Sequence, residues 1–261
     1  MSIDCVKNGG IASVCINRPK RLNAFDTHLW QELRLRFDEI SSDSEVRVVV
    51  LTSAGDRAFC AGIDLNDIPT FEKGSDVARV AKQIRAHILD FQDAVSSIER
   101  CAKPVICVLF GACFGLAIDI ACAADIRFCA QNSKFSVKEV DVGLAADIGT
   151  LQRLPRIVGN GSWVREVSFT ARSFGAEEAL QEGFVSKTFP SKDTAIENAY
   201  GLARELQQKS PVALQATKHL LTYSRDHSVP DALSYTATYN SMAVQSGDIL
   251  AVQTKKPFEK L

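Results

Sequence analysis

The sequence lacks the features that mark membrane proteins and nucleic-acid-binding proteins. No apolar run in its 261 residues approaches the roughly 20 residues that a membrane helix requires. Thirty Lys and Arg residues nearly balance 31 Asp and Glu residues, and no long block of the chain carries one sign. The start, MSIDCVKNGG, has neither a signal-peptide nor a transit-peptide pattern. We therefore expect a soluble intracellular protein with no membrane span and no broad surface for nucleic acid.

Several motifs of known chemistry are also missing. The chain has no C-x-x-C pair, no G-x-S-x-G elbow, no P-loop and no G-x-G-x-x-G dinucleotide loop. Its four histidines, His28, His87, His219 and His227, show no metal-ligand spacing to the cysteines. All eight cysteines lie in the first half, mostly among apolar residues, which predicts buried free thiols in a reducing compartment. Neither a metal site nor a redox cofactor is expected.

Strand and helix patterns alternate through the first half of the chain. The β-branched or apolar runs at 46–53 and 104–111 are typical of strands buried on both faces. Shorter strands are predicted at 10–19 and 126–130, helices from Thr27 and over 77–101 and 111–125, and a surface loop at 69–76. This order predicts an α/β fold with substantial parallel pairing.

The last third of the chain is mainly helical. From about Leu151, helical patterns cover 163–171, 175–183, 193–208, 211–224 and 230–245, and FVSKTF at 184–189 reads as the one strand. A helical last third indicates a region for packing or oligomerisation rather than a second catalytic domain.

Asp119 is the first candidate for chemistry. In LAIDIACAA, every neighbour of Asp119 within three positions is apolar, so no polar helical face is available to it. Burial of an ionised carboxylate without a partner is costly, and the group usually responds with a raised pKa. Asp119 is therefore a candidate functional acid. The alternative is a structural acid that pairs with a distant arginine or caps a nearby loop.

Two further acids flank a glycine in SVKEVDVGLAAD. Glu139 and Asp147 lie eight residues apart, too far to meet along a straight strand. A turn at Gly143 would fold the segment back, so that one acid could remove a proton and the other return it elsewhere. The alternative is that Glu139 and Asp141 lie on a solvated edge while Asp147 caps a helix that begins at Ile148.

Glycines follow two of the buried strands and their turns, in FCAGIDL and in FGACFGLA. Backbone N–H groups at such bends, above all at a helix N-terminus, can point at a developing oxyanion. Two donors from two strand ends could polarise one carbonyl group between them. Ordinary tight turns are the alternative.

Four blocks together resemble one family. INRPKRLNAF, RAFCAGIDL, PVICVLFGACFGLAIDIACAADIRF and KEVDVGLAADIGTLQRLP are similar, in order and spacing, to the crotonase (enoyl-CoA hydratase/isomerase) superfamily. Within it, SVKEVDVGLAADIGTLQRLPRIVGN looks like the dienoyl-CoA isomerases, which convert 3,5-dienoyl-CoA to 2,4-dienoyl-CoA. The resemblance implies a ββα spiral core with the active site over residues 1–195, and a C-terminal helical trimerisation region over 196–261.

The resemblance also implies residue roles. Ile63 and Leu116 would supply the two N–H groups of an oxyanion hole, although GLAID stands here where a more glycine-rich motif is usual. Asp119, Glu139 and Asp147 would be the catalytic acids. The residues implied to bind substrate are Ala61, Gly62, Ile63, Asp64, Leu65 and Leu116. The substrate would be an acyl-CoA thioester with no separate cofactor, and the assembly a homotrimer or a homohexamer.

Other functions and several compartments stay open. A hydratase or a Δ3-Δ2-enoyl-CoA isomerase of the same superfamily is one alternative, and an RNA-binding or scaffold homologue is another. The C-terminal residues Glu259, Lys260 and Leu261 match a peroxisomal S-K-L signal only in part. We expect a peroxisomal protein, with the cytoplasm and mitochondria as alternatives.

Overall fold

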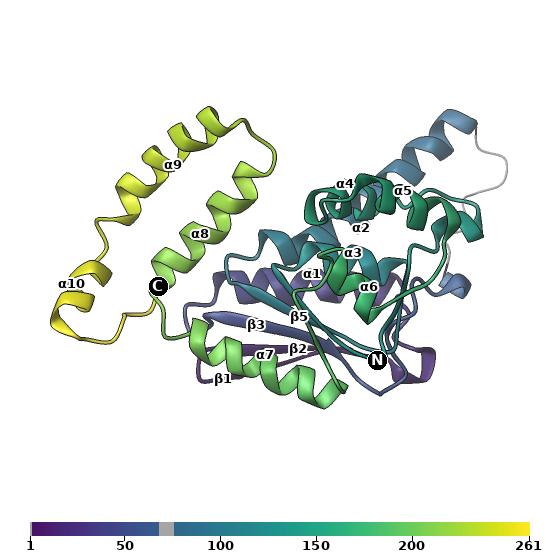
Figure 1. The fold of residues 1–261 in the computed structure, drawn as a ribbon. Helices are drawn as coiled ribbons and strands as arrows, with labels where there is room; N and C mark the ends of the chain where they lie inside the picture. Colours follow the sequence, from purple (N-terminus) through teal and green to yellow (C-terminus); the bar gives the residue numbers. More distant parts are fainter. Residues whose placement is uncertain (1, 68–75) are drawn as a thin grey trace.

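The chain builds two β-sheets with helices packed around them (Figure 1). The computed structural model describes residues 2–67 and 76–261, so most of the loop predicted at 69–76 lies outside the described residues. Among these residues the larger sheet has six strands, in the order β1 (Ser2–Asn8), β2 (Ile11–Asn17), β3 (Val48–Ser53), β5 (Val105–Leu109), β7 (Ile126–Ala130) and β10 (Lys187–Phe189). β1 pairs antiparallel with β2, and the other neighbouring strands of this sheet are parallel. The predicted α/β class with parallel pairing is confirmed.

The second sheet is smaller and was not predicted from the residue pattern. Its strands, in order, are β4 (Ala58–Cys60), β6 (Ala112–Phe114), β8 (Lys134–Ser136) and β9 (Phe174–Gly175). The helix predicted over 111–125 is wrong in its first part, because residues 112–114 form β6 and the helix starts only at Leu116. Gly111 and Gly115 both have positive φ, 56° and 54°, and they turn the chain at each end of β6.

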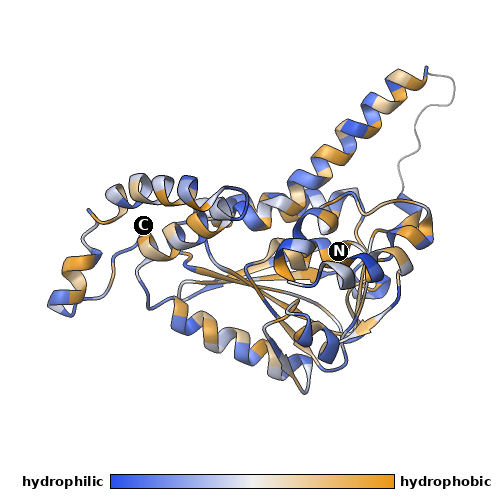
Figure 2. Ribbon diagram, turned by 45° about the horizontal axis from the view of Figure 1, so that its top comes forward, coloured by the Kyte–Doolittle hydropathy of each residue, from blue (hydrophilic) through white to orange (hydrophobic). Residues whose placement is uncertain are grey.

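Two strands and a helix repeat along the chain, as the ββα resemblance implies. β3–β4–α2, β5–β6–α3 and β7–β8–α4 each give one strand to each sheet before the helix. The helices up to α7 are α1 (Thr27–Ser42), α2 (Val77–Arg100), α3 (Leu116–Ala123), α4 (Thr150–Ile157), α5 (Gly161–Thr170), α6 (Ala176–Gln181) and α7 (Lys192–Leu206). Short 3-10 turns lie at η1 (Pro19–Arg21), η2 (Leu65–Asp67) and η3 (Glu139–Val142). The N-terminal half of α2 projects from the body, as Figure 2 shows.

The larger sheet is buried on both faces. On β3, Val49 and Leu51 join the main core, together with side chains of α1, α2, α3 and the second sheet. Val48 and Val50 alternate with them and face α7, whose alanines at 195, 199 and 203 recur every four residues on one helical face. The domain boundary predicted between residues 195 and 196 therefore falls inside α7, a helix that packs on the sheet.

Beyond α7, residues 211–261 form a helical extension that we call the C-terminal arm. It consists of α8 (Pro211–Ser224), α9 (Val229–Ala243), α10 (Asp248–Thr254) and a tail, and its α8–α9 hairpin stands away from the sheets in both views (Figures 1 and 2). Lys218 of α8 attaches the C-terminal arm to the body. Its side chain is buried, and its Nζ lies 2.7 Å from Asp125 Oδ2. No helix among the described residues has the length and apolar character needed to cross a membrane.

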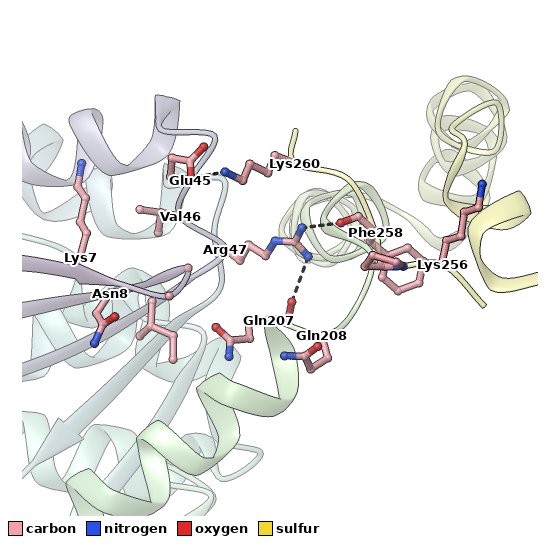
Figure 3. Close-up of a pocket in the computed structure, with 14 residues that line it drawn as sticks. Lys7, Asn8, Glu45, Val46, Arg47, Gln207, Gln208, Lys256, Phe258 and Lys260 are labelled. Atoms are coloured by element: carbon pink, nitrogen blue, oxygen red, sulfur yellow. Dashed lines mark hydrogen bonds and ion pairs between the residues drawn. The ribbon is translucent and has the colours of Figure 1, made fainter. Parts of the chain in front are cut away.

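The tail of the arm returns to the body beside β2. Arg47 donates hydrogen bonds to the carbonyl oxygens of Gln207, at 3.1 Å, and Phe258, at 2.9 Å (Figure 3). Lys260 pairs with Glu45 at 2.5 Å. These contacts line a groove of about 670 Å³ at the amino end of β2. One arginine thus joins the end of α7 to the end of the chain.

Candidate active site

Three strand ends of the second sheet bring the candidate residues together. β4, β6 and β8 run parallel, with Cys60 opposite Cys113 and Phe114 opposite Ser136. Carboxyl ends of parallel strands meet at one edge of a sheet, and that edge is the usual place for a ligand site. Ala61–Ile63 follow β4, Gly115–Leu116 follow β6, and Glu139 follows β8 after two residues. The three turns of the spiral therefore each contribute one part of the site.

Two main-chain N–H groups face this edge from adjoining loops. Gly62 and Gly115 have φ values of 104° and 54°, and a Cβ on Gly115 would lie 3.9 Å from Gly62 Cα. Leu116 is the first residue of α3, where an N–H has no acceptor within the helix. Within the described part of the chain, neither Ile63 N–H nor Leu116 N–H donates a hydrogen bond. Both donors, one of them at the positive end of a helix dipole, are free for a ligand oxygen.

The loops open into a cavity of about 420 Å³. Apolar side chains of α2 and of residues 142–148 form much of its wall: Ile88, Phe91, Val142, Leu144 and Ile148. All three predicted acids, Asp119, Glu139 and Asp147, line the same cavity. Carboxyl groups within an apolar wall are partly shielded from water, which favours their neutral forms.

Asp119 is a buried acid with a structural partner, and it also lines the cavity. Its side chain lines the cavity, but Oδ1 also accepts the N–H and the hydroxyl of Thr150, at 2.6 and 2.8 Å. Burial raises the pKa of Asp119 to about 7; the negative charge of Glu139 adds to this rise, and the Thr150 hydrogen bonds oppose it. Asp119 thus anchors the start of α4 and is still able to change charge near neutral pH.

Glu139 is half-buried at the start of η3, with its carboxyl group beside Gly115. A Cβ on Gly115 would lie 3.2 Å from Glu139 Oε1. Glu139 Oε2 is buried and has no hydrogen-bond partner among the described residues. Burial raises the pKa of Glu139, and the negative charge of Asp147 raises it further. Glu139 is therefore a carboxyl group with one oxygen free to take a proton.

Asp147 lies between two glycines of positive φ, Gly143 at 87° and Gly149 at 146°. The alternative role of Asp147 as a helix cap is wrong: α4 begins at Thr150 rather than Ile148, and the first N–H of α4 bonds to Asp119 instead. The backbone carbonyl of Asp147 accepts a hydrogen bond from Gln92 Nε2 at 2.5 Å. Its carboxylate is thereby left to the cavity.

The remaining predicted residues divide into two groups. Ala61, Gly62, Ile63, Leu65 and Leu116 line the cavity. Asp64 does not line it, because its carboxylate is held by Arg18, at 2.9 Å, and by the Asn66 side chain at 3.0 Å. Asp141 likewise points outward and pairs with Lys138.

Sequence reasoning missed the contribution of α2 to the wall, including His87, Ile88 and Phe91. The only signal for them was the apolar stripe of that helix, which every packed helix shows. Among the described residues, no group of three or more His, Cys, Asp or Glu side chains is arranged to hold a metal ion.

Comparison with known proteins agrees with this geometry. The model of the enoyl-CoA hydratase/isomerase family matches residues 6–250. The chain belongs to this family. The fold of solved members is the same: an enoyl-CoA hydratase from Bacillus anthracis superposes with a TM-score of 0.88 at 25% identity, over 100% of this chain and 99% of that one. The expected crotonase fold is confirmed.

Several family members with curated names are more similar in sequence. The human mitochondrial Δ(3,5)-Δ(2,4)-dienoyl-CoA isomerase is 48% identical over 243 residues, which is 92% of this chain and 74% of the relative. The peroxisomal enzyme of the same name from Arabidopsis thaliana is 39% identical, over 93% of this chain and 88% of its own length. A short-chain-enoyl-CoA hydratase from Clostridium acetobutylicum is 31% identical, over 88% and 84%.

Proposed function

We propose that the protein is a dienoyl-CoA isomerase that converts 3,5-dienoyl-CoA to 2,4-dienoyl-CoA. The observation that supports this best is the presence of three carboxyl groups in one apolar cavity beside two free N–H groups. Relatives that carry this name are 34 to 48% identical over more than nine-tenths of the chain. The substrate is an acyl-CoA thioester, and its CoA belongs to the substrate rather than to the enzyme.

The N–H groups of Ile63 and Leu116 bind the thioester oxygen and stabilise the negative charge that forms on it. Loss of a C2 proton then gives a dienolate that extends from the thioester to C6. A proton added at C6 leaves double bonds at C2–C3 and C4–C5, so both bonds move and no atom is gained overall. The reaction therefore requires one proton acceptor at C2 and one proton donor at C6.

We assign the C2 proton to Glu139 and the C6 proton to Asp147. The Glu139 carboxyl group packs beside Gly115, which directly precedes the Leu116 N–H, and so faces the thioester end of the chain. Asp147 belongs to the residue 143–149 segment, whose side chains Leu144 and Ile148 form part of the apolar cavity wall. Burial raises the pKa of Glu139, and the negative charge of Asp147 raises it further, so the two acids affect each other across the cavity they share.

The direct test is turnover of a 3,5-dienoyl-CoA, followed by the ultraviolet absorbance of the conjugated 2,4-product. Asp147→Asn and Glu139→Gln should each lower kcat by about 10²- to 10⁴-fold, the usual contribution of general acid–base catalysis. In deuterated water, Asp147→Asn should still exchange the C2 hydrogen of the substrate, because Glu139 remains, whereas Glu139→Gln should not. Wild-type turnover in both variants would refute the mechanism, and the opposite exchange pattern would reverse the assignment.

A hydratase is the alternative that the family makes reasonable, since hydratases are among the relatives at 31% identity. Hydration would yield a 3-hydroxyacyl-CoA, which mass spectrometry separates from an isomer of unchanged mass. Two acids around a water would suffice for hydration, whereas this cavity contains three. A nucleic-acid-binding or scaffold role would instead leave Glu139 and Asp147 in the cavity without a use.

We also propose that the C-terminal arm assembles the protein as a homotrimer or a homohexamer. Large apolar side chains are exposed on the arm, among them Leu221, Leu233, Ile249, Leu250 and Val252 at 52 to 68%. Exposure of this extent on neighbouring helices marks an interaction surface. Light scattering on the purified protein would measure the mass; a monomer at micromolar concentration would contradict the proposal.

For the compartment we propose an organelle that oxidises unsaturated fatty acids, with the peroxisome as the first candidate. The named relatives include both mitochondrial and peroxisomal proteins. A fluorescent protein fused to the N-terminus leaves Glu259, Lys260 and Leu261 free. Peroxisomal fluorescence that is lost on removal of these three residues would support their role as a targeting signal. Unchanged peroxisomal fluorescence would contradict that role.

A further inference from the structure

Arg153 of α4 lies directly behind the segment that carries Asp147. Its Nη1 atom lies 2.0 Å from the point that a Cβ on Gly149 would occupy. The guanidinium group thus fills the space that any side chain at position 149 would need. Gly149 also has a φ of 146°, a conformation open mainly to glycine. The glycine and the arginine are therefore fitted to each other.

The guanidinium group is itself fixed by α2. Nε lies 3.2 Å from Glu99 Oε1, and Nη2 lies 3.3 Å from Glu99 Oε2 and 2.9 Å from Ser96 Oγ. The side chains of Arg153 and Glu99 are only 12% and 17% exposed. A two-point contact of this kind needs the planar fork of arginine, and lysine cannot reproduce it.

Glu99 also connects this contact to the C-terminal arm. Arg225, just after α8, donates a hydrogen bond to the same Oε1 atom that faces Arg153. Burial opposes ionisation of Glu99, but Arg225 and Arg153 outweigh it and hold the pKa of Glu99 below its ordinary value. The carboxylate therefore stays charged at neutral pH and keeps both arginines in place.

Asp119 also lies near this point on Gly149. Asp119 Oδ1 lies 4.0 Å from the point that a Cβ on Gly149 would occupy, and Arg153 Nη1 lies 2.0 Å from the same point. The distance between these two atoms therefore cannot exceed the sum of these two distances. The positive charge of Arg153 lowers the pKa of Asp119, against burial and Glu139, which raise it. The buried thiols of Cys60 and Cys122 also interact electrostatically with Asp119, and Asp147, His87 and Lys138 line the same cavity.

We propose that Arg153 is a positioning residue for the reaction: it holds residues 147–150 against α2, so that Asp147 faces the cavity and Thr150 meets Asp119. This inference rests on the proposed isomerase function. Arg153 does not line the cavity and acts through the acids rather than on the substrate. Its charge in addition favours the ionised form of Asp119, which gives the arginine a second, separable effect on the pH profile.

The test compares Arg153→Gln and Arg153→Lys with Arg156→Gln. Arg156, one turn further along α4, pairs with Asp226 at 3.2 Å and, in the described part of the chain, forms no hydrogen bond or ion pair with Gly149 or Glu99, so it controls for the loss of one charge from the helix. Both Arg153 variants should lower kcat by about 10- to 100-fold with little change in KM, because the acids are displaced rather than the binding surface. Arg153→Gln should also move the acidic limb of the pH profile of kcat to higher pH. Arg153→Lys should return that limb to its wild-type position. Arg156→Gln should change neither kcat nor the position of the limb.

Hydrogen exchange measured by mass spectrometry tests the positioning without any substrate. Amides of residues 143–150 should exchange faster in both Arg153 variants than in wild type or in Arg156→Gln. Wild-type kcat and wild-type exchange in Arg153→Lys would overturn the proposal, as would equal effects of Arg156→Gln. If Arg153→Gln fails to fold, Arg153→Lys alone decides. If the wild-type protein does not isomerise the diene, the proposed function fails, and the exchange result still decides whether Arg153 holds the segment.

Discussion

Replacement of Asp119 by Asn should make the stability of the protein less dependent on pH. In the wild-type protein the pKa of Asp119 rises from 3.8 to about 7 on folding, mainly because the group is buried. A folded state that binds a proton more tightly than the unfolded chain loses stability as the pH rises. The loss of stability begins above pH 3.8, the pKa of the aspartate in the unfolded chain. It is complete once the pH has passed the pKa of about 7 in the folded protein. The Asp119→Asn variant has no such proton.

The size of the effect follows from the pKa difference. One pKa unit corresponds to about 1.4 kcal/mol, so the two units between pH 5 and pH 7 correspond to about 2 to 3 kcal/mol. The variant should gain this amount of unfolding free energy relative to wild type between pH 5 and pH 8.5, and most of it below pH 7. A change in unfolding free energy that does not depend on pH, such as that from a weaker hydrogen bond to Thr150, adds equally at every pH. It does not alter the predicted change in relative stability between pH 5 and pH 8.5.

The measurement is urea unfolding at several pH values from 5 to 8.5, at one protein concentration because assembly affects apparent stability. Asp141→Asn is the matched control, since Asp141 is an exposed acid of the same segment. Turnover of the Asp119→Asn variant should fall even as its stability relative to wild type increases from pH 5 to pH 8, the trade-off expected of an active-site charge. A stability difference that stays constant across the range would refute the reasoning.

Two further substitutions test the framework of the site. Gly115→Ala should cost about 1 to 3 kcal/mol of backbone strain, because the φ of Gly115 is 54°. It should also abolish most turnover, because the new Cβ would lie 3.2 Å from Glu139 Oε1. A wild-type kcat in this variant would contradict the prediction. Lys218→Met should lower the unfolding free energy by about 3 to 5 kcal/mol, because it removes the ammonium group that pairs with Asp125. The double variant that also carries Asp125→Asn should recover part of this loss. Urea unfolding of both variants measures the two effects.

The sequence predicted the long elements well and the short ones badly. The apolar stripe of α1, including Leu29, Leu33, Phe37 and Ile40, is fully buried as its spacing indicates. The runs that became β3 and β5 are buried throughout. The second sheet went unpredicted because its strands have two or three residues, too few for any periodicity, and pairing across the fold makes them strands.

For the site, residue chemistry was informative where the surroundings were unusual. Asp119 stood out because an acid among apolar residues must have a partner or a use, and the structure shows its partner, Thr150, and its place in the cavity wall. Asp147 had a plausible role as a cap, and only the position of the Thr150 N–H rules it out. His87, Ile88 and Phe91 come from α2, far earlier in the chain, and only tertiary packing places them in the same cavity wall as Asp147.

The polarising groups of the site belong to the main chain, whereas its acids belong to side chains. Exchange of Leu116 for a larger or smaller residue reshapes the pocket wall yet leaves its amide in position, and only proline would delete that donor. Each carboxyl group, in contrast, can be gained or lost by one codon change while both main-chain donors remain. Proteins built on this scaffold can therefore keep their hold on a thioester while they diverge in where, and whether, they move protons along the attached chain.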